Sequence, residues 1–405
     1  MKIEARPEDV GLSTQRLGRV SDWMRRQVDE GRLPGISVAI ARRDRLAFFE
    51  TYGASDVERG VPLAAETIFR IYSMTKPITT VAALMLYEEG RFQLDDPLAD
   101  YLPEFAQPRV WAGGDVRAPT TVRAEQPITI AQLMTHTAGF TYGFLDEHPL
   151  DALYRERGVD FQRGDTPLAE LVVLLAEQPL LFQPGSRWNY SVATDVLGRL
   201  IEVLSGESLD RYFEQRILAP LGMHDTAFFV PEGKRERFAA NYGPAKDGGL
   251  ELVDPATGSR FTRPMVTFSG GGGLVSTAGD YLRFTRMLAR RGELDGVRLL
   301  GRKTVETMTT NHLPGDLAAM GRPRFAETTY EGIGFGLGVS VMLDPARARI
   351  MGSPGEYAWG GAASTAFWID PVEELIVLLL TQLTPSSSYP LRRELRVLGY
   401  QAIID

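Results

Sequence analysis

Ser73 and Lys76 are residues whose types and spacing could do chemistry. They belong to the tetrapeptide Ser-Met-Thr-Lys, which Pro77 and an apolar run over residues 78–89 follow. The run predicts a helix. If the helix begins near Ser73, positions 73 and 76 share one face, and the lysine amine can reach the serine hydroxyl. Pro77 fits, because an N–H in the first helical turn has no intrahelical partner to lose.

This pair could supply a nucleophile. A serine hydroxyl becomes nucleophilic when a base takes its proton, and the positive end of a helix favours the negative charge that develops. Lysine is that base if its surroundings hold it neutral; alternatively it stays charged and stabilises a tyrosinate. The residues leave both roles open. The competing interpretation is a serine that caps the helix and a solvated lysine.

A tyrosine in a turn-rich stretch is the second candidate. Residues 184–192 read Pro-Gly-Ser-Arg-Trp-Asn-Tyr-Ser-Val and precede a predicted helix over residues 193–204. A phenol held at Tyr190 could accept the Ser73 proton and return it to a leaving group. The alternative is a tyrosine that packs against the helix start.

The third candidate is Trp359-Gly360-Gly361-Ala362, which precedes a predicted strand over residues 363–369. Paired glycines permit close approach of the backbone to a ligand. A strand that begins there could present the Ala362 N–H beside the N–H of Ser73, and two such donors form an oxyanion hole. The alternative is a turn that opens the strand beside a buried tryptophan.

These three elements, in this order, resemble the class C beta-lactamase superfamily, which includes D-alanyl-D-alanine peptidases and the family VIII carboxylesterases. The resemblance covers almost the whole chain. Supporting stretches are residues 90–97 (Gly-x-x-x-Leu-Asp-Asp-Pro), 133–139 (Leu-Met-Thr-His-Thr-Ala-Gly), 218–223 (Leu-Ala-Pro-Leu-Gly-Met) and 272–277 (Gly-Gly-Leu-Val-Ser-Thr). The resemblance implies that Ser73 is the nucleophile, Lys76 its partner and Tyr190 the catalytic phenol, with Ser73 and Ala362 as oxyanion donors.

Two departures from the family pattern bear on the substrate. Beta-lactamases usually carry Tyr-x-Asn and Lys-Thr-Gly, where this chain has Val192 and Trp359-Gly360-Gly361. An apolar branch and an indole in place of an amide and an ammonium favour neutral, apolar acyl groups. We therefore expect a serine carboxylesterase that hydrolyses neutral short- to medium-chain esters through an acyl-enzyme on Ser73. The alternatives are beta-lactamase- or peptidase-like amide hydrolysis, acyl transfer through the same intermediate, and a non-catalytic binding homologue.

Four further features of the sequence bear on the chemistry of the site. Tyr142 could form an aromatic wall of the acyl pocket or simply pack. The run Ser-Gly-Gly-Gly-Gly over residues 269–273 lacks the Gly-Lys-Ser/Thr of a phosphate loop and is interpreted as a structural turn. The histidines at positions 136, 148, 224 and 312 have no metal-ligand spacing, so neither metal nor cofactor is expected. No serine lies in Gly-x-Ser-x-Gly, which disfavours the alpha/beta-hydrolase triad.

The elements that position these residues predict an α+β fold. We expect helices over residues 13–31, 166–178, 193–204, 208–217 and 391–404, a capping box at 129–132, strands over 36–41, 46–52, 363–369 and 375–382, and long loops over 107–127 and 230–264. This pattern predicts an antiparallel sheet flanked by N- and C-terminal helices, in a discontinuous domain of residues 1–88 and 330–405. Residues 89–329 would form an inserted, mainly helical domain with long loops.

Composition narrows the class of partner. The chain has 405 residues, a formal net charge of -8, no basic run and no cysteine. An acidic balance argues against nucleic acid and anionic membrane surfaces, and a small-molecule ester remains the expected partner. The charged start lacks a signal-peptide apolar region, and no apolar run is long enough to span a bilayer. We expect a cytoplasmic protein.

Overall fold

The computed structural model describes residues 1–246, 248–321, 324–325 and 328–405. Residue 247 of the predicted loop over residues 230–264 lies outside the described residues. The same holds for residues 322–323 and 326–327 of the predicted helical segment.

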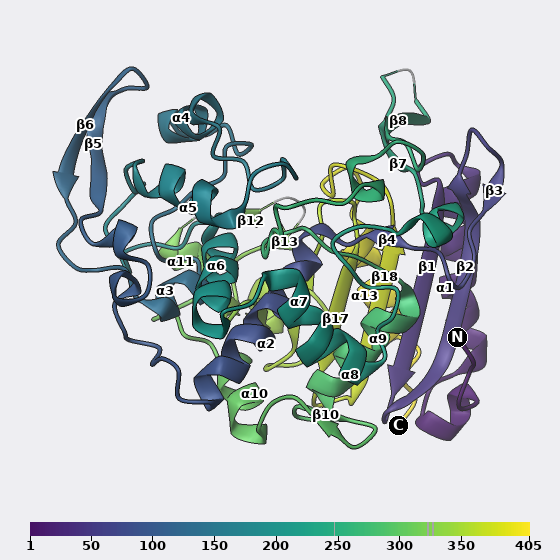
Figure 1. The fold of residues 1–405 in the computed structure, drawn as a ribbon. Coiled ribbons are helices and arrows are strands. Elements are labelled where there is room, and N and C mark those ends of the chain that lie inside the picture. Colours follow the sequence, from purple (N-terminus) through teal and green to yellow (C-terminus); the bar gives the residue numbers. More distant parts are fainter. Residues whose placement is uncertain (247, 322–323, 326–327) are drawn as a thin grey trace.

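An antiparallel sheet joins the two ends of the chain. Its eight strands follow the order β14-β15-β16-β17-β18-β1-β2-β3. They are β1 (Gly35–Arg42), β2 (Arg45–Asp56), β3 (Val61–Pro62), β14 (Ile333–Phe335), β15 (Ser340–Met342), β16 (Tyr357–Gly360), β17 (Ala366–Asp370) and β18 (Leu375–Thr381). Figure 1 shows β1 and β2, in purple, beside β17 and β18, in yellow, with both chain ends on this side. The predicted α+β class is confirmed.

The central strands are buried because both faces of the sheet are covered. Every residue of β1 and β18 is buried. On one face, Ile36 and Val38 pack with residues of α1 (Thr14–Asp29) and α13 (Leu391–Tyr400). On the other face, Ala39 belongs to the core that includes residues of α2 (Thr75–Glu88) and α9 (Ala278–Ala289). Burial on both faces explains why β18 is a continuous apolar run and why the large apolar residues of β1 alternate with small ones rather than with charged ones.

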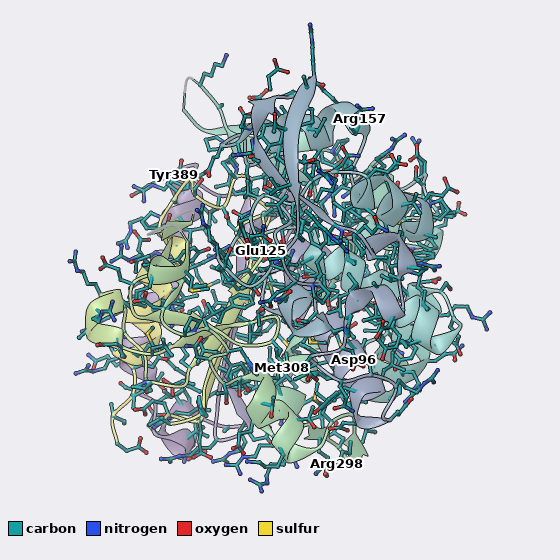
Figure 2. All side chains as sticks on the ribbon, turned by 90° about the vertical axis from the view of Figure 1, so that its left-hand side faces the viewer. Asp96, Glu125, Arg157, Arg298, Met308 and Tyr389 are labelled. Carbon is teal, nitrogen blue, oxygen red and sulfur yellow. The ribbon has the colours of Figure 1, made fainter. Side chains whose placement is uncertain are left out.

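Helices build the other side of the molecule around one buried helix, α2 (Thr75–Glu88). Every residue from Thr75 to Leu86 is buried, and α6 (Ala193–Ser205) packs against it. The remaining helices are α3 (Ile130–Met134), α4 (Pro149–Arg157), α5 (Leu168–Ala176), α7 (Leu209–Phe213), α8 (Ala219–Leu221), α10 (Arg302–Met308), α11 (Leu317–Met320) and α12 (Pro345–Ala348). Figure 2 views this side, with Arg157 and Arg298 near the outline of the molecule.

Several predicted boundaries were wrong. The predicted loop over residues 107–127 contains the hairpin of β5 (Arg109–Asp115) and β6 (Ala118–Arg123), and the loop over 230–264 contains β7 (Asn241–Pro244) and β8 (Leu250–Asp254). Most residues of β6 and β8 are exposed or half-buried, so these ribbons lack the apolar alternation that marks a strand.

Three further boundaries differ from the prediction. The strand predicted over residues 363–369 begins at Ala366, because residues 361–365 turn the chain between β16 and β17. The closing helix ends at Tyr400 instead of residue 404. The helix predicted over residues 208–217 divides into α7 and a π-helical turn, Glu214–Leu218.

A buried arginine anchors the segment that leads to Ser73. Arg70, in β4 (Phe69–Arg70), is 0% exposed, and its guanidinium donates to Asp254 Oδ2 at 2.8 Å, Ala239 O at 2.5 Å and Ser259 Oγ at 3.1 Å. It also lies 4.1 Å from the centre of the Phe238 ring. One side chain therefore ties β4 to the chain around residues 238–259.

We expect the substitution Arg70→Met to lower the free energy of unfolding by about 3 kcal/mol, because it leaves one carboxylate and a buried carbonyl without their donor. Chemical denaturation of both proteins measures this difference. Arg302→Met is the control, since the Arg302 side chain is 58% exposed. Equal losses in the two variants would contradict a stabilising role for Arg70.

Candidate active site

The nucleophile turn lies between β4 and α2. Ser73 is in a 3-10 turn, Tyr72–Met74, and α2 follows at Thr75, so the helix begins two residues later than Ser73. Tyr72 has a φ of 41°, a left-handed conformation that is unfavourable for an aromatic residue. Hydrogen bonds from Leu274 N to Thr75 Oγ1 at 3.1 Å and from the Tyr281 hydroxyl to Met74 O at 2.9 Å hold the turn.

Lys76 lies directly behind the serine and is 0% exposed. Its ammonium donates to Gly271 O at 2.7 Å, to the Tyr142 hydroxyl at 2.9 Å and, at the longer distance of 3.4 Å, to Ser73 Oγ. An ammonium has three N–H donors, so these contacts account for all of them. Lys76 Nζ also lies 4.6 Å from the centre of the Tyr190 ring, where the face of a phenol attracts a cation.

Tyr190 also contacts the nucleophile Ser73. Its hydroxyl donates to Ser73 Oγ at 2.5 Å, and only 6% of the residue is exposed. The preceding Asn189 fixes the loop, because its N–H donates to His136 O at 3.0 Å and its side-chain amide donates to Phe140 O at 3.0 Å. The structure therefore brings the Ser73, Lys76 and Tyr190 side chains together.

His136 supports the loop that carries Tyr190. Its ring lies 5.1 Å from the Tyr190 ring, and its Nδ1 is 3.2 Å from Ser191 Oγ. Burial, followed by the charge of Lys76, lowers the pKa of His136 well below its usual value, so the imidazole is neutral at pH 7. The stretch over residues 133–139 therefore contributes the neutral His136 ring, which packs against the loop that carries Tyr190.

Tyr142, which could have lined the acyl pocket or simply packed, contacts Lys76. Its hydroxyl accepts from Lys76, and its ring stacks on Phe144 at 4.7 Å. Burial, followed by the nearby Tyr190 and Asp195, raises the pKa of Tyr142 well above its usual value, so the phenol is protonated. Tyr142 is not among the residues that line the cavity described below.

The end of β16 touches the nucleophile turn. A Cβ atom on Gly361 would lie 2.3 Å from Ile71 O, so only glycine permits this approach. Gly361 N donates to Thr365 O at 2.9 Å, and Arg392 of α13 donates to Gly361 O at 3.0 Å and to Thr365 O at 3.1 Å. Ala362 is exposed in this turn and lines the same cavity as Ser73.

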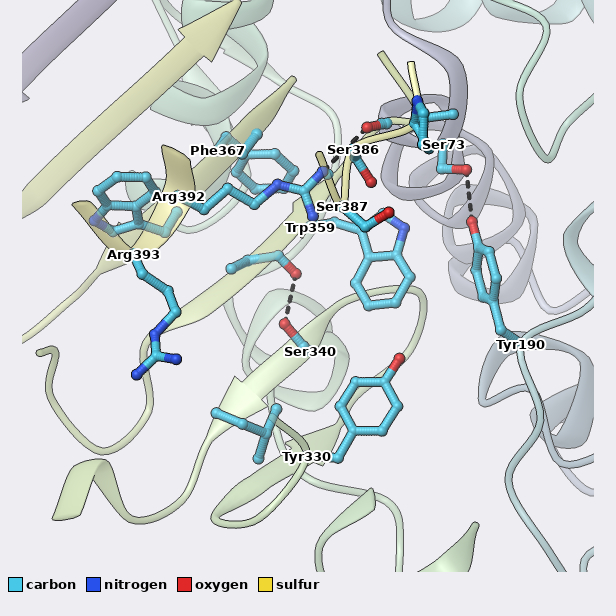
Figure 3. A pocket seen from close by; sticks show the side chains of 18 of the residues that line it. Ser73, Tyr190, Tyr330, Ser340, Trp359, Phe367, Ser386, Ser387, Arg392 and Arg393 are labelled. Atoms are coloured by element: carbon cyan, nitrogen blue, oxygen red, sulfur yellow. Dashed lines mark hydrogen bonds between the residues drawn. The ribbon is translucent and has the colours of Figure 1, made fainter. Parts of the chain in front are cut away.

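A cavity of about 670 Å³ opens beside Ser73. Its wall combines Ser73, Tyr190, Ala362 and the β16 residues Trp359 and Gly360 with apolar side chains that include Tyr330, Ile333, Met342 and Ile350. Figure 3 shows the contact between Tyr190 and Ser73, with the Trp359 indole beside it and Arg392 beyond. The Trp359 ring centre lies 5.6 Å from that of Tyr190. The wall of the cavity is mainly apolar, and it also includes five charged residues: Glu147, Glu356, Arg392, Arg393 and Arg396.

Gly360, Gly361 and Trp359 lie at the cavity as expected, whereas Val192 lies apart from it. Val192 is 2% exposed at the start of α6, and its N–H donates to Thr141 O at 3.3 Å. It is not among the residues that line the cavity. In the structure, Val192 contributes to the core under the Tyr190 loop.

The sequence reasoning missed the contribution of Gly271 and Asp195. The glycine run over residues 269–273 was interpreted only as a structural turn, yet the Gly271 carbonyl accepts from Lys76. The buried Asp195 carboxylate in turn accepts from Gly271 N at 3.0 Å. A carboxylate among the buried positions of the predicted helix over residues 193–204 was the available signal.

Metal sites and membrane-spanning helices are two other features that the structure could contain. Within the described ranges, no group of three or more His, Asp or Glu side chains is placed to hold a metal ion. None of the helices described is both long enough and apolar enough to cross a membrane.

Comparison with known proteins places this geometry in a family. The Beta-lactamase family model matches residues 20–401. The chain is 34% identical over 389 residues to the esterase EstB of Burkholderia gladioli, covering 92% of this chain and 91% of EstB. The solved structure of EstCE1, a hydrolase with promiscuous acyltransferase activity, has a TM-score of 0.81 and 29% identity and covers 95% of this chain and 99% of its own. Unliganded simvastatin synthase (LovD) from Aspergillus terreus has a TM-score of 0.77 and 25% identity, over 97% of this chain and 98% of its own. The chain therefore belongs to the beta-lactamase family and is a serine hydrolase of the esterase type.

Proposed function

We propose that this protein hydrolyses neutral carboxylic esters of short to medium acyl chain length through an acyl-enzyme on Ser73. The observation that carries the proposal is the position of Ser73 Oγ, which is 2.5 Å from the Tyr190 hydroxyl and 3.4 Å from Lys76 Nζ. A serine held between a phenol and a buried ammonium, beside an apolar cavity, has the groups that acyl transfer requires.

We assign the proton transfers to Tyr190. Lys76 already donates to three acceptors, and its Nζ lies 4.6 Å from the centre of the Tyr190 ring, where it is placed to stabilise the negative charge of a phenolate. The phenolate takes the Ser73 proton as Oγ attacks the ester carbonyl carbon, and the phenol then protonates the departing alkoxide. Tyr190 then takes a proton from water, whose oxygen attacks the acyl carbon, and the phenol returns that proton to Ser73 Oγ as the bond to the acyl group breaks and the acid is released. The N–H groups of Ser73 and Ala362 would hold the oxyanion in both steps.

The walls of the cavity support a neutral substrate. Trp359 places an indole where the ammonium of the Lys-Thr-Gly motif of related beta-lactamases would stand, and the neighbouring side chains are mostly apolar. Arg392, which also lines the cavity, donates to the backbone of the turn over residues 361–365. Apolar surface favours an acyl chain, whereas a substrate carboxylate next to the indole would lose its hydration without a paired charge.

Acyl transfer to an alcohol is the second candidate function. It uses the same intermediate, with an alcohol in place of water. The description of EstCE1 as a hydrolase with promiscuous acyltransferase activity favours this candidate over amide hydrolysis. Product analysis of the ester reaction in the presence of a primary alcohol separates transfer from hydrolysis.

The variant Ser73→Ala should lose at least about 1,000-fold of kcat/KM on p-nitrophenyl butyrate, because no other group is placed to form the acyl-enzyme. Release of p-nitrophenol measures the rate, and mass spectrometry after a phosphonate ester locates the adduct. Ser186→Ala, at an exposed serine on the Tyr190 loop, is the control. Wild-type turnover equal to that of Ser73→Ala would refute the proposed nucleophile.

We expect kcat/KM for p-nitrophenyl butyrate to exceed that for nitrocefin by at least about tenfold, since the site lacks a cation at the Trp359 position to meet the carboxylate of the lactam. The two assays are run on one preparation of the enzyme. The variant Trp359→Lys should narrow the ratio by restoring an ammonium. A wild-type preference for nitrocefin would reverse the assignment of the substrate.

Tyr142→Phe should lower kcat by about 10- to 100-fold with little change in KM, because it removes a hydroxyl that accepts from the Lys76 ammonium. Initial rates over a range of ester concentrations separate the two constants. Tyr87→Phe, at the far end of α2, is the matched control. A raised KM with unchanged kcat would instead identify Tyr142 as a wall of the acyl pocket.

A further inference from the structure

A buried carboxylate, Asp195, is linked to Lys76 through the backbone of Gly271. Asp195, the third residue of α6, is 1% exposed. Its Oδ1 accepts from Ser269 Oγ at 2.6 Å and from Gly271 N at 3.0 Å. Its Oδ2 is buried and has no hydrogen-bond partner among the residues described. A carboxyl group placed in the core with one unsatisfied oxygen is costly unless its charge is compensated.

Gly271 connects this carboxylate to the lysine. Its N–H donates to Asp195, and its carbonyl accepts from Lys76 Nζ at 2.7 Å. A Cβ atom at position 271 would lie 2.4 Å from Asp195 Oδ2, and one at Gly270 would lie 2.7 Å from Thr194 O. Glycine at these two positions thus lets the backbone of residues 270–271 lie directly against the first turn of α6. The contact requires both the glycine run and the aspartate.

Among the described groups that contact Lys76, only Tyr190 could supply a compensating charge, and only in the phenolate form that the reaction requires. The acceptors of Lys76 described in the structure are a serine hydroxyl, a phenol and a carbonyl. Tyr142 is protonated, and His136 is neutral, for the reasons given above. Tyr190 contributes its ring and its hydroxyl. Among the described residues, Asp195 is the acidic side chain that hydrogen bonds connect to Lys76, through the carbonyl and the N–H of Gly271.

Asp195 and Lys76 also interact electrostatically. Burial raises the pKa of Asp195, whereas the charge of Lys76 and the hydrogen bonds from Ser269 and Gly271 oppose that rise. The negative charge of Asp160 acts in the same direction as burial and raises the pKa of Asp195. Two opposite charges in one core each lower the cost of burying the other.

We propose that Asp195 is a positioning residue that supplies the buried negative charge opposite Lys76, through the Gly271 backbone, and so sets the pH range in which Ser73, Lys76 and Tyr190 act together. This inference rests on the proposed esterase function for its natural readout. Asp195 is not among the residues that line the cavity, so it acts on the reaction through Lys76 and the groups around it and not by contact with the substrate.

The pH profile of Asp195→Asn tests the proposal. The amide keeps an acceptor for Ser269 and Gly271 but removes the charge. A nearby negative charge favours the protonated form of every neighbouring base, so its loss makes both the phenol and the ammonium give up their protons at lower pH. We expect both limbs of the kcat/KM profile on p-nitrophenyl butyrate to move to lower pH by about one unit. Asp195→Glu, which keeps the charge, should retain the limbs of the wild type.

Controls separate charge from structure. Asp280→Asn removes another buried aspartate in the first turn of a helix, α9, whose carboxylate accepts from Asp225 N and Thr226 and does not contact the Lys76 group. Its profile should keep the limbs of the wild type. Asp195→Ser is a second neutral variant that avoids a buried amide, should Asp195→Asn fail to fold, and it should show the same shift. Unchanged limbs in a folded neutral variant, or equal shifts in Asp195→Glu, would overturn the proposal.

A second readout keeps this test independent of ester turnover. The rate at which a phosphonate ester modifies Ser73, measured by mass spectrometry against pH, depends on the same proton transfers. If the wild type is labelled but hydrolyses no ester, the proposed esterase function fails, and the pH dependence of labelling in the wild type and Asp195→Asn still decides the role of Asp195. If the wild type is neither labelled nor active, both proposals fail.

Discussion

The buried ammonium of Lys76 is the constraint on which the rest of the site depends. It is 0% exposed, and it is held by a serine hydroxyl, a phenol and a carbonyl that come from three distant parts of the chain. A cation without water needs such acceptors, because its desolvation costs far more than a single hydrogen bond returns. The turn of Ser73, the segment of Tyr142 and the glycine run must therefore meet at one point.

Close contact between backbone segments makes that meeting possible. Gly361 brings the end of β16 against Ile71, next to the nucleophile, and Gly271 brings its own carbonyl to Lys76 over the first turn of α6. A side chain at either position would collide with backbone or with a carboxylate. These glycines therefore determine the geometry of the site, although a glycine pair in a sequence indicates only a turn.

The sheet supplies the rigidity. β1 pairs with β18 along its length, β18 pairs with β17, and β17 pairs with β16. Helices cover both faces of this sheet, so β16 and β17 are held in a rigid framework built from both ends of the chain. The turn over residues 361–365 is further fixed from α13 by Arg392. The cavity therefore has one wall on the sheet and another on the helical side, where Tyr190 is held by Asn189 and His136. The domain boundaries at residues 88 and 330 stay a prediction.

Local pattern alone determined much of the answer. The spacing of Ser73 and Lys76, the turn before Tyr190, the capped helices and the apolar central strands all follow from periodicity and turn chemistry within a few residues. For this reason the α+β class and the family could be predicted. The hairpins β5–β6 and β7–β8 could not, since every residue of β6 and β8 is exposed or half-buried and these strands therefore bury no apolar face.

Only the tertiary structure decided which groups touch Lys76. For Tyr142 the sequence left open a wall of the acyl pocket or simple packing, and in the structure its hydroxyl contacts Lys76. Val192, predicted to contact the substrate, lies in the core. Asp195 and Gly271 are separated by 76 positions and become partners through a hydrogen bond. Contacts of this kind depend on how elements pack and on which polar groups must find partners once water is excluded, and neither is written in the spacing of residues along the chain.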